Sequence, residues 1–599
     1  MPKDKNNISN DSIFLQTIQR GIEKGILVLN DDQTKITYNC SRTYTIGFKN
    51  PEEKVRAAYF CELVLDQQYP EKHINIEVIV PRRTPEDRAD IVVYEDEELK
   101  KPYLIVECKK DGTTDKEFRQ AIEQVFGNAN SLRGKYASVV AGITKTAFDI
   151  AGFNPSEREK NVISDIPKKY GKAPKYKYIK GESELKVVAR EDLIKTLEKC
   201  HDTVWQGGRR SPETAFDEIS KLLFCKLKDE KDTTKNNPYQ FQIGTYESAD
   251  EVAKRILAIY EKARKSDEQV FKEDILLEPK IIYSVVEHLQ LLAIGKIDLD
   301  TKGIAFEKFM QAYFRGKMGQ FFTPRPIVDF CIKMLDPERA DLILDPACGS
   351  GGFLLHTMDS VRLFAEKNYD EQEAWRHWHE FAKNNLYGIE VNDQIARVCK
   401  MNMIIHDDGH TNIINTDSLK DFDEIAQVHK RFAPDYFDII LTNPPFGATV
   451  KSTENDYLKK YELGKDKKNQ KTEILFIERC IEFVKPKVGI IGIVLPDGIL
   501  TNSSLQYVRD FIMEHCQILA VVSLPQFAFA HYGAGVKSSL VFLRRKGVTE
   551  KLKDYPIFMA IAEHIGYDAT GREDAKNDFH EIHQEYLKFL KNPSNYKGI

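Results

Sequence analysis

A short polar turn at residues 443–446 directly follows an apolar run, and its residue types could do chemistry. The run Ile439–Thr442 is typical of a buried strand. Proline gives no N–H to a sheet, so Pro444 and Pro445 end the strand and make the turn rigid. The side-chain oxygen of Asn443 and the carbonyl of Pro444 are two acceptors that could hold an amino group. Phe446 adds a ring face on which a planar group could stack.

A glycine-rich turn further upstream indicates a second ligand-binding element. In "LILDPACGSGGFLL" an apolar strand ends at Asp345, and a turn containing Ala347, Gly349 and Gly351 leads into an apolar helix. Glycines permit a tight turn and let a ligand approach the bare backbone. The turn has neither the G-x-G-x-x-G of a dinucleotide site nor the Gly-Lys-Ser/Thr of a P-loop.

Three acids follow successive predicted strands, at the edge where α/β sheets bind ligands. Asp345 places an anion where a positively charged amino acid moiety could sit. Glu390 ends "LYGIE" and could hold ribose hydroxyls. Asp417 follows "NIINT" and could accept a hydrogen bond from an adenine amino group. Their common position is stronger evidence for a ligand than each acid alone.

In this order, "DPACGSGGFLL", Glu390, Asp417 and "NPPF" resemble the motifs of amino-group DNA methyltransferases. The upstream "GQFFTP" is similar to the adenine-N6 branch. The resemblance covers roughly residues 205–575, includes "DEISKLLFCKL" and "IGYDATGRED", and is closest to modification subunits of type I restriction systems. It implies S-adenosylmethionine as cofactor, with its methionine part near three residues of "GQFFTP": Phe322, Thr323 and Pro324.

The resemblance gives the polar turn a specific chemistry. The exocyclic amine of adenine is a poor nucleophile, because its lone pair is delocalised into the ring. Asn443 and Pro444 would accept both of its N–H bonds and turn the lone pair toward the methyl sulfonium. Phe446 would face a base flipped out of the duplex. Asn-Pro-Pro-aromatic also occurs in protein-glutamine methyltransferases, the nearest alternative; the helical region before this fold, "GQFFTP" and the large N-terminal domain favour DNA.

The N-terminal region carries a second candidate site. "RADIVVY" and "LIVECKK" place Asp90, Glu107 and Lys109 on neighbouring predicted strands, with Glu107 and Lys109 on one face. Two carboxylates can bind Mg²⁺, and a lysine can activate water or stabilise a phosphorane.

Over about residues 30–150 this pattern resembles the PD-(D/E)xK nuclease fold, as found at the N-terminus of type I restriction subunits. Gln124 lies on the following helix, and either Glu53 or Glu62 could supply a further acid. A bare D…ExK pattern also arises by chance, so DNA cleavage is an open alternative to a role in assembly or DNA contact.

The elements that must position these residues predict an α/β protein of several domains. We expect a nuclease-like α/β domain at 1–190, a helical domain at 205–320, and a Rossmann-like S-adenosylmethionine-dependent methyltransferase domain at 321–560. A C-terminal tail at 561–599 is expected to dock partners. At 599 residues the chain is too long for one core.

Composition excludes several classes of protein. Net charge is −5, so a nucleic-acid site must be local, and the 10 cysteines form no C-x-x-C pair. No apolar run is long enough to span a bilayer, and the N-terminus lacks a signal-peptide pattern, so we expect a cytoplasmic location without membrane association.

The function we expect is methylation of adenine N6 in a specific double-stranded DNA sequence, within a restriction–modification system. A separate DNA specificity subunit would select the sequence, because no target-recognition module is visible. A restriction or motor subunit is a further expected partner, since the chain has no Walker motif. The alternatives are a Mg²⁺-dependent nuclease whose methyltransferase half senses cofactor or methylation, and a scaffold that binds S-adenosylmethionine for assembly.

Overall fold

The computed structural model describes residues 10–81, 87–152, 158–206, 209–265, 273–297, 301–303, 305–306, 308–309, 323–406, 412–530, 535–552 and 554–593. The chain divides into two compact units. Unit 1 comprises residues 1–211 and 221–305, and unit 2 comprises residues 212–220 and 306–599. Among the described helices, none combines the length and apolar character needed to cross a membrane.

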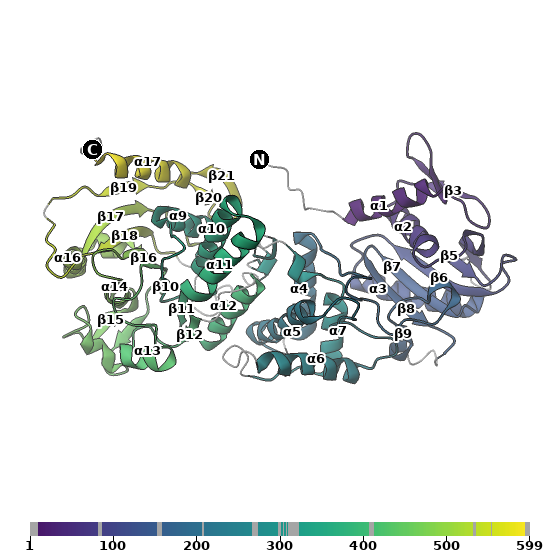
Figure 1. Cartoon of the computed structure of the whole chain (residues 1–599), viewed down its shortest axis with the longest axis horizontal. Helices are drawn as coiled ribbons and strands as arrows, with labels where there is room; N and C mark the ends of the chain where they lie inside the picture. The colour runs from purple at the N-terminus through teal and green to yellow at the C-terminus, as the bar shows by residue number, and fades with distance from the viewer. Residues whose placement is uncertain are drawn as a thin grey trace. The chain divides into compact units, whose positions relative to one another are not determined.

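A six-stranded sheet forms the centre of the N-terminal part of unit 1, in the order β4-β5-β6-β7-β8-β9 (Figure 1). Its strands are β4 (Ile74–Val80), β5 (Asp87–Tyr94), β6 (Pro102–Lys109), β7 (Tyr136–Ala141), β8 (Thr144–Asp149) and β9 (Val162–Ile163). Strands β6 and β7 are parallel and are joined through helix α3 (Asp115–Leu132), whereas the other neighbours are antiparallel. The strands and the helix predicted from 74 to 132 are confirmed.

Two helices cover the two faces of this sheet, because successive strand residues point to opposite sides. Ile91 and Val93 share a core with helix α2 (Pro51–Leu65), while Val92 and Tyr94 share one with α3. Both helices begin with a capping side chain. Asn50 accepts the N–H of Glu52 before α2, and Thr114 forms a capping box with Glu117 before α3.

The rest of unit 1 is a small sheet and a helical part. Helix α1 (Asn10–Glu23) precedes the three-stranded sheet β1 (Leu27–Leu29), β2 (Lys35–Tyr38) and β3 (Tyr44–Gly47). The helices are α4 (Arg190–Trp205), α5 (Pro212–Asp232), α6 (Ala249–Arg264) and α7 (Pro279–Leu289), and four 3₁₀ turns lie between elements: Glu71–His73, Arg158–Asn161, Lys168–Tyr170 and Ile294–Lys296.

Residues 221–305 of the helical segment predicted at 205–320 lie in the same compact unit as the N-terminal sheet. One hydrogen bond between them runs from Tyr246 to Asp149 of β8 (2.7 Å). Residues 212–220 belong instead to unit 2. The four domain boundaries expected from sequence stay predictions.

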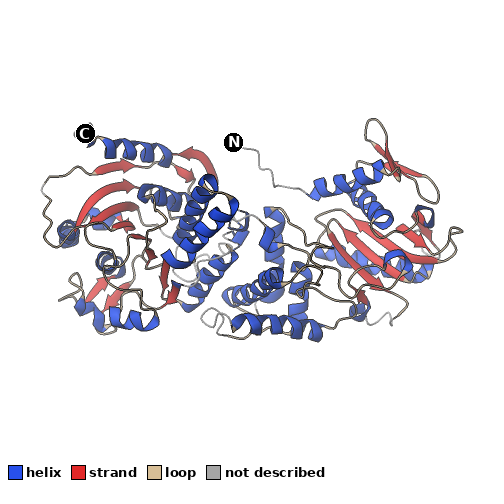
Figure 2. Cartoon of the chain, in the orientation of Figure 1, coloured by secondary structure: helices blue, strands red, loops and turns tan. Residues whose placement is uncertain are grey.

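Unit 2 contains an eight-stranded sheet in the order β12-β11-β10-β13-β16-β18-β17-β19 (Figures 1 and 2). The strands are β10 (Ile343–Asp345), β11 (Leu386–Glu390), β12 (Ile413–Asn415), β13 (Ile439–Thr442), β16 (Ile490–Pro496), β17 (Cys516–Ser523), β18 (Ser538–Arg545) and β19 (Phe558–Ile561). Strand β18 is antiparallel to both of its neighbours, and the other pairs are parallel. The predicted strand–helix alternation is confirmed.

The helices of unit 2 lie between these strands in the chain. They are α9 (Arg325–Leu335), α10 (Gly352–Asn368), α11 (Glu371–Asn385), α12 (Asp393–Ile405), α13 (Phe422–Val428), α14 (Thr472–Phe483), α15 (Asp497–Thr501), α16 (Gln506–His515) and α17 (Phe579–Lys591). Two hairpins complete the unit, β14 (Thr449–Lys451) with β15 (Asn469–Lys471) and β20 (Ile565–Tyr567) with β21 (Glu573–Asn577), as do 3₁₀ turns at Asp456–Lys460 and Ser503–Leu505.

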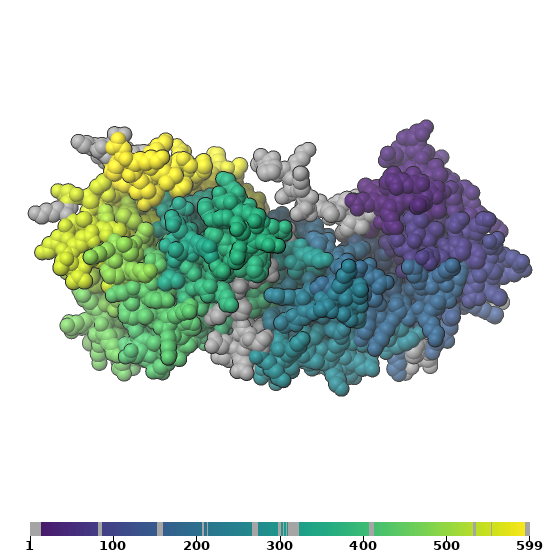
Figure 3. Space-filling model, viewed as in Figure 1, coloured from purple at the N-terminus to yellow at the C-terminus, as the bar shows by residue number. Residues whose placement is uncertain are grey.

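Two cores sandwich this sheet. Val541 and Leu543 of β18 share one core with helices α14 and α16. Phe542 alternates to the other face and meets Phe330 of α9, which stacks on Phe579 of α17 with ring centroids 4.4 Å apart. Helix α17 therefore packs against α9 within unit 2. It belongs to the C-terminal segment, which is yellow in Figure 3.

Candidate functional site

Four neighbouring strands of unit 2 end at one edge, and the predicted site residues lie there. Asp345 ends β10 opposite Gly388, and Glu390 ends β11 opposite Asn415 of β12. Asn443 directly follows β13, which pairs with the other side of β10. The parallel register thus brings together acids and an amide that lie up to about 100 residues apart in the chain, as the sequence predicted.

The glycine-rich turn after β10 is shaped by positive backbone angles and is tied down by Glu390. Gly349 has φ +51° and Gly351 has φ +90°, a region that favours glycine. A side chain at Gly351 would collide with the Cys399 sulfur, 2.9 Å from its Cβ position, whereas space is open beside Gly349. The N–H of Gly349 donates to Glu390 Oε2 (3.1 Å), so the acid predicted to hold a ribose also fixes the turn.

Asp345 lies beneath this turn in a dry environment. It is 1% exposed, and its Oδ1 accepts the N–H of Ala347 (3.0 Å). The pKa of this carboxyl is raised to about 7, mainly by burial and also by the nearby Glu390 charge, while the hydrogen bond from the Ala347 N–H opposes the rise. Its charge therefore depends on pH near neutrality.

Asp417 is half-buried just beyond β12 and has two partners. Its Oδ1 accepts the N–H of Leu419 (2.9 Å), and its Oδ2 accepts the hydroxyl of Tyr457 (2.9 Å). Sequence reasoning missed Tyr457, because it lies 40 residues downstream in a segment without a motif.

The side-chain amide of Asn443 uses its nitrogen in a hydrogen bond but not its oxygen, as far as the described residues show. Its Nδ2 donates to Thr323 Oγ1 (3.0 Å), whereas its Oδ1 is buried and has no hydrogen-bond partner among the described residues. Thr323 and Pro324 directly precede α9; Phe322, predicted beside the cofactor, lies outside the described residues. A buried acceptor without a donor is costly unless a ligand supplies one.

The remainder of the "NPPF" turn presents a ring beside this acceptor. Pro444 is buried, Pro445 is exposed, and Phe446 is half-buried, with its ring 6.5 Å from that of Phe529 at 88°. The turn is held by Glu473, whose Oε2 accepts the N–H of Gly447 (3.2 Å). Phe529 and Glu473 were not predicted, since neither belongs to a motif.

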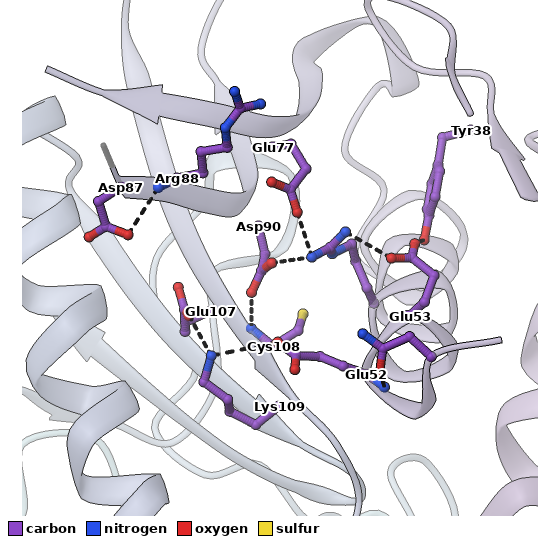
Figure 4. Close-up of polar contacts among 12 residues, drawn as sticks. Tyr38, Glu52, Glu53, Glu77, Asp87, Arg88, Asp90, Glu107, Cys108 and Lys109 are labelled. Atoms are coloured by element: carbon purple, nitrogen blue, oxygen red, sulfur yellow. Dashed lines mark hydrogen bonds and ion pairs between the residues drawn. The ribbon is translucent and has the colours of Figure 1, made fainter. Parts of the chain in front are cut away.

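Two of the N-terminal candidates, Glu53 and Asp90, join Glu77 in a carboxylate cluster around the buried Arg56, here called the Arg56 cluster (Figure 4). Arg56 of α2 contacts Glu53 (2.8 Å), Glu77 (2.7 Å) and Asp90. The second oxygen of Asp90 accepts the N–H of Cys108 (2.6 Å). Burial disfavours the guanidinium charge, but Asp90 and Glu53 more than offset this and raise the pKa of Arg56.

Glu107 and Lys109 lie beside this cluster, on β6. Lys109 Nζ donates to Glu107 Oε1 (2.7 Å), and Glu107 Oε2 is buried without a partner among the described residues. The pKa of Glu107 is raised to about 8 overall. Burial is the main cause and the Asp90 charge adds to it, whereas Lys109 opposes the rise.

The two other N-terminal candidates bond to residues other than Asp90. Gln124 donates to Asp87 (3.3 Å), and Glu62 pairs with Lys145. Of the two acids considered as a third ligand, Glu53 is therefore the one that shares a partner with Asp90. In the described part of the chain, no group of three or more His, Cys, Asp or Glu side chains is arranged to hold a metal ion.

The strand-end residues fit S-adenosylmethionine. Asp345 can counter an ammonium group, space is open beside Gly349 of the glycine turn that Glu390 holds, and Asn443 has a buried acceptor without a partner among the described residues. The N-terminal residues fit Mg²⁺ only in part. Glu107 has a buried oxygen with no hydrogen-bond partner among the described residues, but Arg56 donates to one oxygen of Asp90.

Comparison with known proteins identifies two families along the chain. Residues 298–596 match the N-6 DNA Methylase family, and residues 51–167 match the family described as "Type I restriction enzyme R protein N terminus (HSDR_N)". The first match covers half of the 599-residue chain and contains all the strand-end candidates.

Two curated relatives are methylase subunits of type I restriction enzymes. The EcoEI methylase subunit of Escherichia coli is 30% identical over 247 residues, which cover 40% of this chain and 45% of that protein. The EcoKI methylase subunit of Escherichia coli strain K12 is 25% identical over 395 residues, 61% of this chain and 69% of that protein. The chain thus covers less than half of the first relative's length.

A solved structure described as "Structural basis underlying complex assembly and conformational transition of the type I R-M system" shares the fold. It is 19% identical, has a TM-score of 0.50, and covers 68% of this chain and 85% of that chain. The family match over residues 298–596 shows that the chain belongs to the N-6 DNA Methylase family, and residues 51–167 are similar to the N terminus of type I restriction R proteins.

Proposed function

We propose that this chain transfers a methyl group from S-adenosylmethionine to adenine N6 in double-stranded DNA, as the modification component of a type I-like restriction–modification system. The observation that carries the proposal is the buried Oδ1 of Asn443 at the end of β13, which has no hydrogen-bond partner among the residues that the structure describes. An acceptor in that state suits an incoming N–H donor, and an adenine amino group provides two.

The cofactor-binding role is assigned to the residues around the glycine turn. S-adenosylmethionine, when bound, supplies an electrophilic methyl group on a sulfonium. Asp345 would attract its ammonium group, and Glu390 and Asp417 would orient its ribose and adenine. The remaining residues assigned to cofactor binding are Phe322, Thr323, Pro324, Ala347, Gly349 and Gly351.

Asn443 and Pro444 do the chemical positioning. Their two oxygens accept the N–H bonds of the target amine, which localises its lone pair toward the methyl group. Thr323 Oγ1 accepts the Asn443 Nδ2–H, so the amide presents its oxygen to the base. Phe446, supported edge-on by Phe529, gives the flipped base a stacking face. Pro445 keeps the turn rigid, and no covalent enzyme intermediate is required.

Partner subunits complete the proposed function. A DNA specificity subunit selects the sequence, and a restriction or motor subunit joins the assembly; the methylase relatives are named as subunits of type I enzymes, which supports this. The proposed domain division is a nuclease-like domain at 1–190, a helical domain at 205–320, the methyltransferase at 321–560 and a docking segment at 561–599.

A methyl-transfer assay tests the proposal. The chain, co-purified with its native partners, is incubated with tritiated S-adenosylmethionine and duplexes that contain adenine or N6-methyladenine at the same positions. Transfer to the first duplex alone supports the proposal. Transfer to glutamine in a co-purified protein, with none to DNA, would assign the chain to the protein-glutamine alternative.

A second candidate function, DNA cleavage, is favoured by one observation on β6. Glu107 keeps a buried oxygen unpaired beside the Lys109 ammonium, a pairing suited to a metal and a phosphate. We propose a PD-(D/E)xK-like site in which Asp90 and Glu107 would hold Mg²⁺, Lys109 would assist at the phosphate and Gln124 would flank the site. Mg²⁺-dependent nicking that is lost in Asp90→Asn tests this function.

A further inference from the structure

Arg56 is enclosed by carboxylates from three different elements. Glu53 lies one helical turn before it on α2, Glu77 comes from β4, and Asp90 comes from β5. The arginine is 6% exposed, so its charge is balanced by these acids rather than by water. The cluster therefore already contains a cation in contact with Asp90, a carboxylate proposed above as a metal ligand.

The backbone of β4 is distorted at the residue that completes this enclosure. Glu77 has φ +54°, in the left-handed region. It lies between the β4–β5 pairs Ile76–Ile91 and Val78–Ala89 and is not itself one of the paired residues. A glutamate rarely adopts this conformation without compensation from its surroundings. Here its carboxylate contacts the Arg56 guanidinium at 2.7 Å, which indicates that the ion pair stabilises the distortion.

Asp90 has little capacity left for a metal. Its Oδ1 accepts from Arg56, and its Oδ2 accepts the N–H of Cys108 at 2.6 Å. A divalent cation would need at least one of these oxygens, and Arg56 holds the one that the main chain does not. Glu107 Oε2, by contrast, is unpaired.

We infer that Arg56 blocks the divalent-cation position of the N-terminal domain, so that a metal binds at Asp90 and Glu107 after the guanidinium has been displaced. This inference rests on the proposed nuclease-like site. The domain is then silent toward Mg²⁺ in the state seen here, and whatever moves Arg56 away from Asp90 switches it on. The proposal concerns metal binding at this site, so it can be tested without an assay of DNA cleavage.

The test is Mn²⁺ binding to the full chain, measured by electron paramagnetic resonance and calorimetry. Mn²⁺ stands in for Mg²⁺, since both prefer oxygen ligands. We expect Arg56→Gln to bind Mn²⁺ roughly tenfold or more tightly than the unsubstituted chain, because a like charge at contact distance has been removed. Adding Asp90→Asn should remove the gain. Arg20→Gln is the matched control, because Arg20 pairs with Asp66 at the surface, 53% exposed.

The outcomes separate the inference from the function on which it rests. Equal, Asp90-dependent Mn²⁺ binding with and without Arg56 would overturn the block while leaving the metal site intact. No binding in a folded Arg56→Gln chain would overturn both. If Arg56→Gln does not fold, Arg56→Lys is the second variant: a single ammonium cannot span three carboxylates, so we expect its Mn²⁺ affinity to exceed that of the unsubstituted chain, and an unchanged affinity would contradict the block.

Discussion

The Arg56 cluster and the strand-end site of unit 2 both collect acids, but they neutralise them differently. In the Arg56 cluster, a buried guanidinium balances Glu53, Glu77 and Asp90. At the strand ends, main-chain N–H groups satisfy the acids: Ala347 donates to Asp345, and Gly349 donates to Glu390. Main-chain donors hold an acid in place without supplying a counter-charge.

This difference teaches how an acid site stays available to a ligand. A carboxylate held by N–H groups has no internal cation to displace when a cationic group arrives, whereas a carboxylate paired with an internal arginine does. The same distinction applies to Asn443, whose amide nitrogen is bonded while its oxygen is left for a ligand. Four substitutions or conditions would break or sharpen the comparison.

Removal of the internal cation should have the largest effect. Arg56→Met leaves three buried or half-buried acids without their partner, and we expect the free energy of unfolding to fall by roughly 3–5 kcal/mol. Urea unfolding measures this. Arg20→Met is the control and should cost less than about 1 kcal/mol, as exposed pairs do. Similar losses of unfolding free energy in Arg56→Met and Arg20→Met would show that the buried cluster stabilises the fold no more than an exposed ion pair does.

Removal of the unpaired acceptor should abolish most of the chemistry without loss of the cofactor. Asn443→Ala is expected to lower the rate of methyl transfer by roughly 10²–10³-fold, the cost of losing one group that stabilises the transition state. Single-turnover transfer of tritiated methyl to DNA measures the rate, and calorimetry measures cofactor affinity. A folded variant that no longer binds S-adenosylmethionine would contradict the assigned role.

The buried acid at the glycine turn should make cofactor binding depend on pH. The pKa of Asp345 is about 7 in the folded chain, so its anion becomes dominant between pH 6 and pH 8. We expect cofactor affinity to rise roughly tenfold over this range, because the anion attracts the ammonium group. Asp345→Asn should flatten the calorimetric pH profile.

The stability of the folded chain should depend on Asp345 in the opposite direction to cofactor affinity, and fall as pH rises. The pKa of Asp345 is raised on folding, so between about pH 4 and pH 7 the folded chain holds a proton that the unfolded chain has lost. The contribution of Asp345 to stability therefore declines as pH rises through this window. A contribution that grows over the same range, measured against Asp345→Asn, would contradict the assignment.

The smallest expected effect belongs to the residue that orients the amide. Thr323→Val removes the acceptor for Asn443 Nδ2, and we expect kcat to fall roughly 3- to 10-fold with an unchanged KM for DNA, in line with one hydrogen bond. Thr323→Ser keeps the hydroxyl and should restore the rate. Equal losses in both variants would indicate a packing role instead.

Much of the fold was predictable because it rests on local patterns. The helix at 115–132 begins with a capping box, and the strands β4 to β6 are rich in β-branched residues. Asp345, Glu390 and Asn443 could be placed at one edge, since parallel strands present their carboxyl ends together. The division of the helical region between two units was not predictable, because it depends on hydrogen bonds between distant segments such as Tyr246 and Asp149.

The order of residues along the chain accounts for which chemical groups stand at strand ends, since a strand and the turn after it are covalently continuous. Which partner each group finds is decided in three dimensions. Thr323 and Asn443 are 120 residues apart, and Arg56 meets Asp90 across 34 residues. Hydrogen bonds and ion pairs act over a few ångströms of space, so whether an acid is open or neutralised depends on packing that local sequence patterns do not encode.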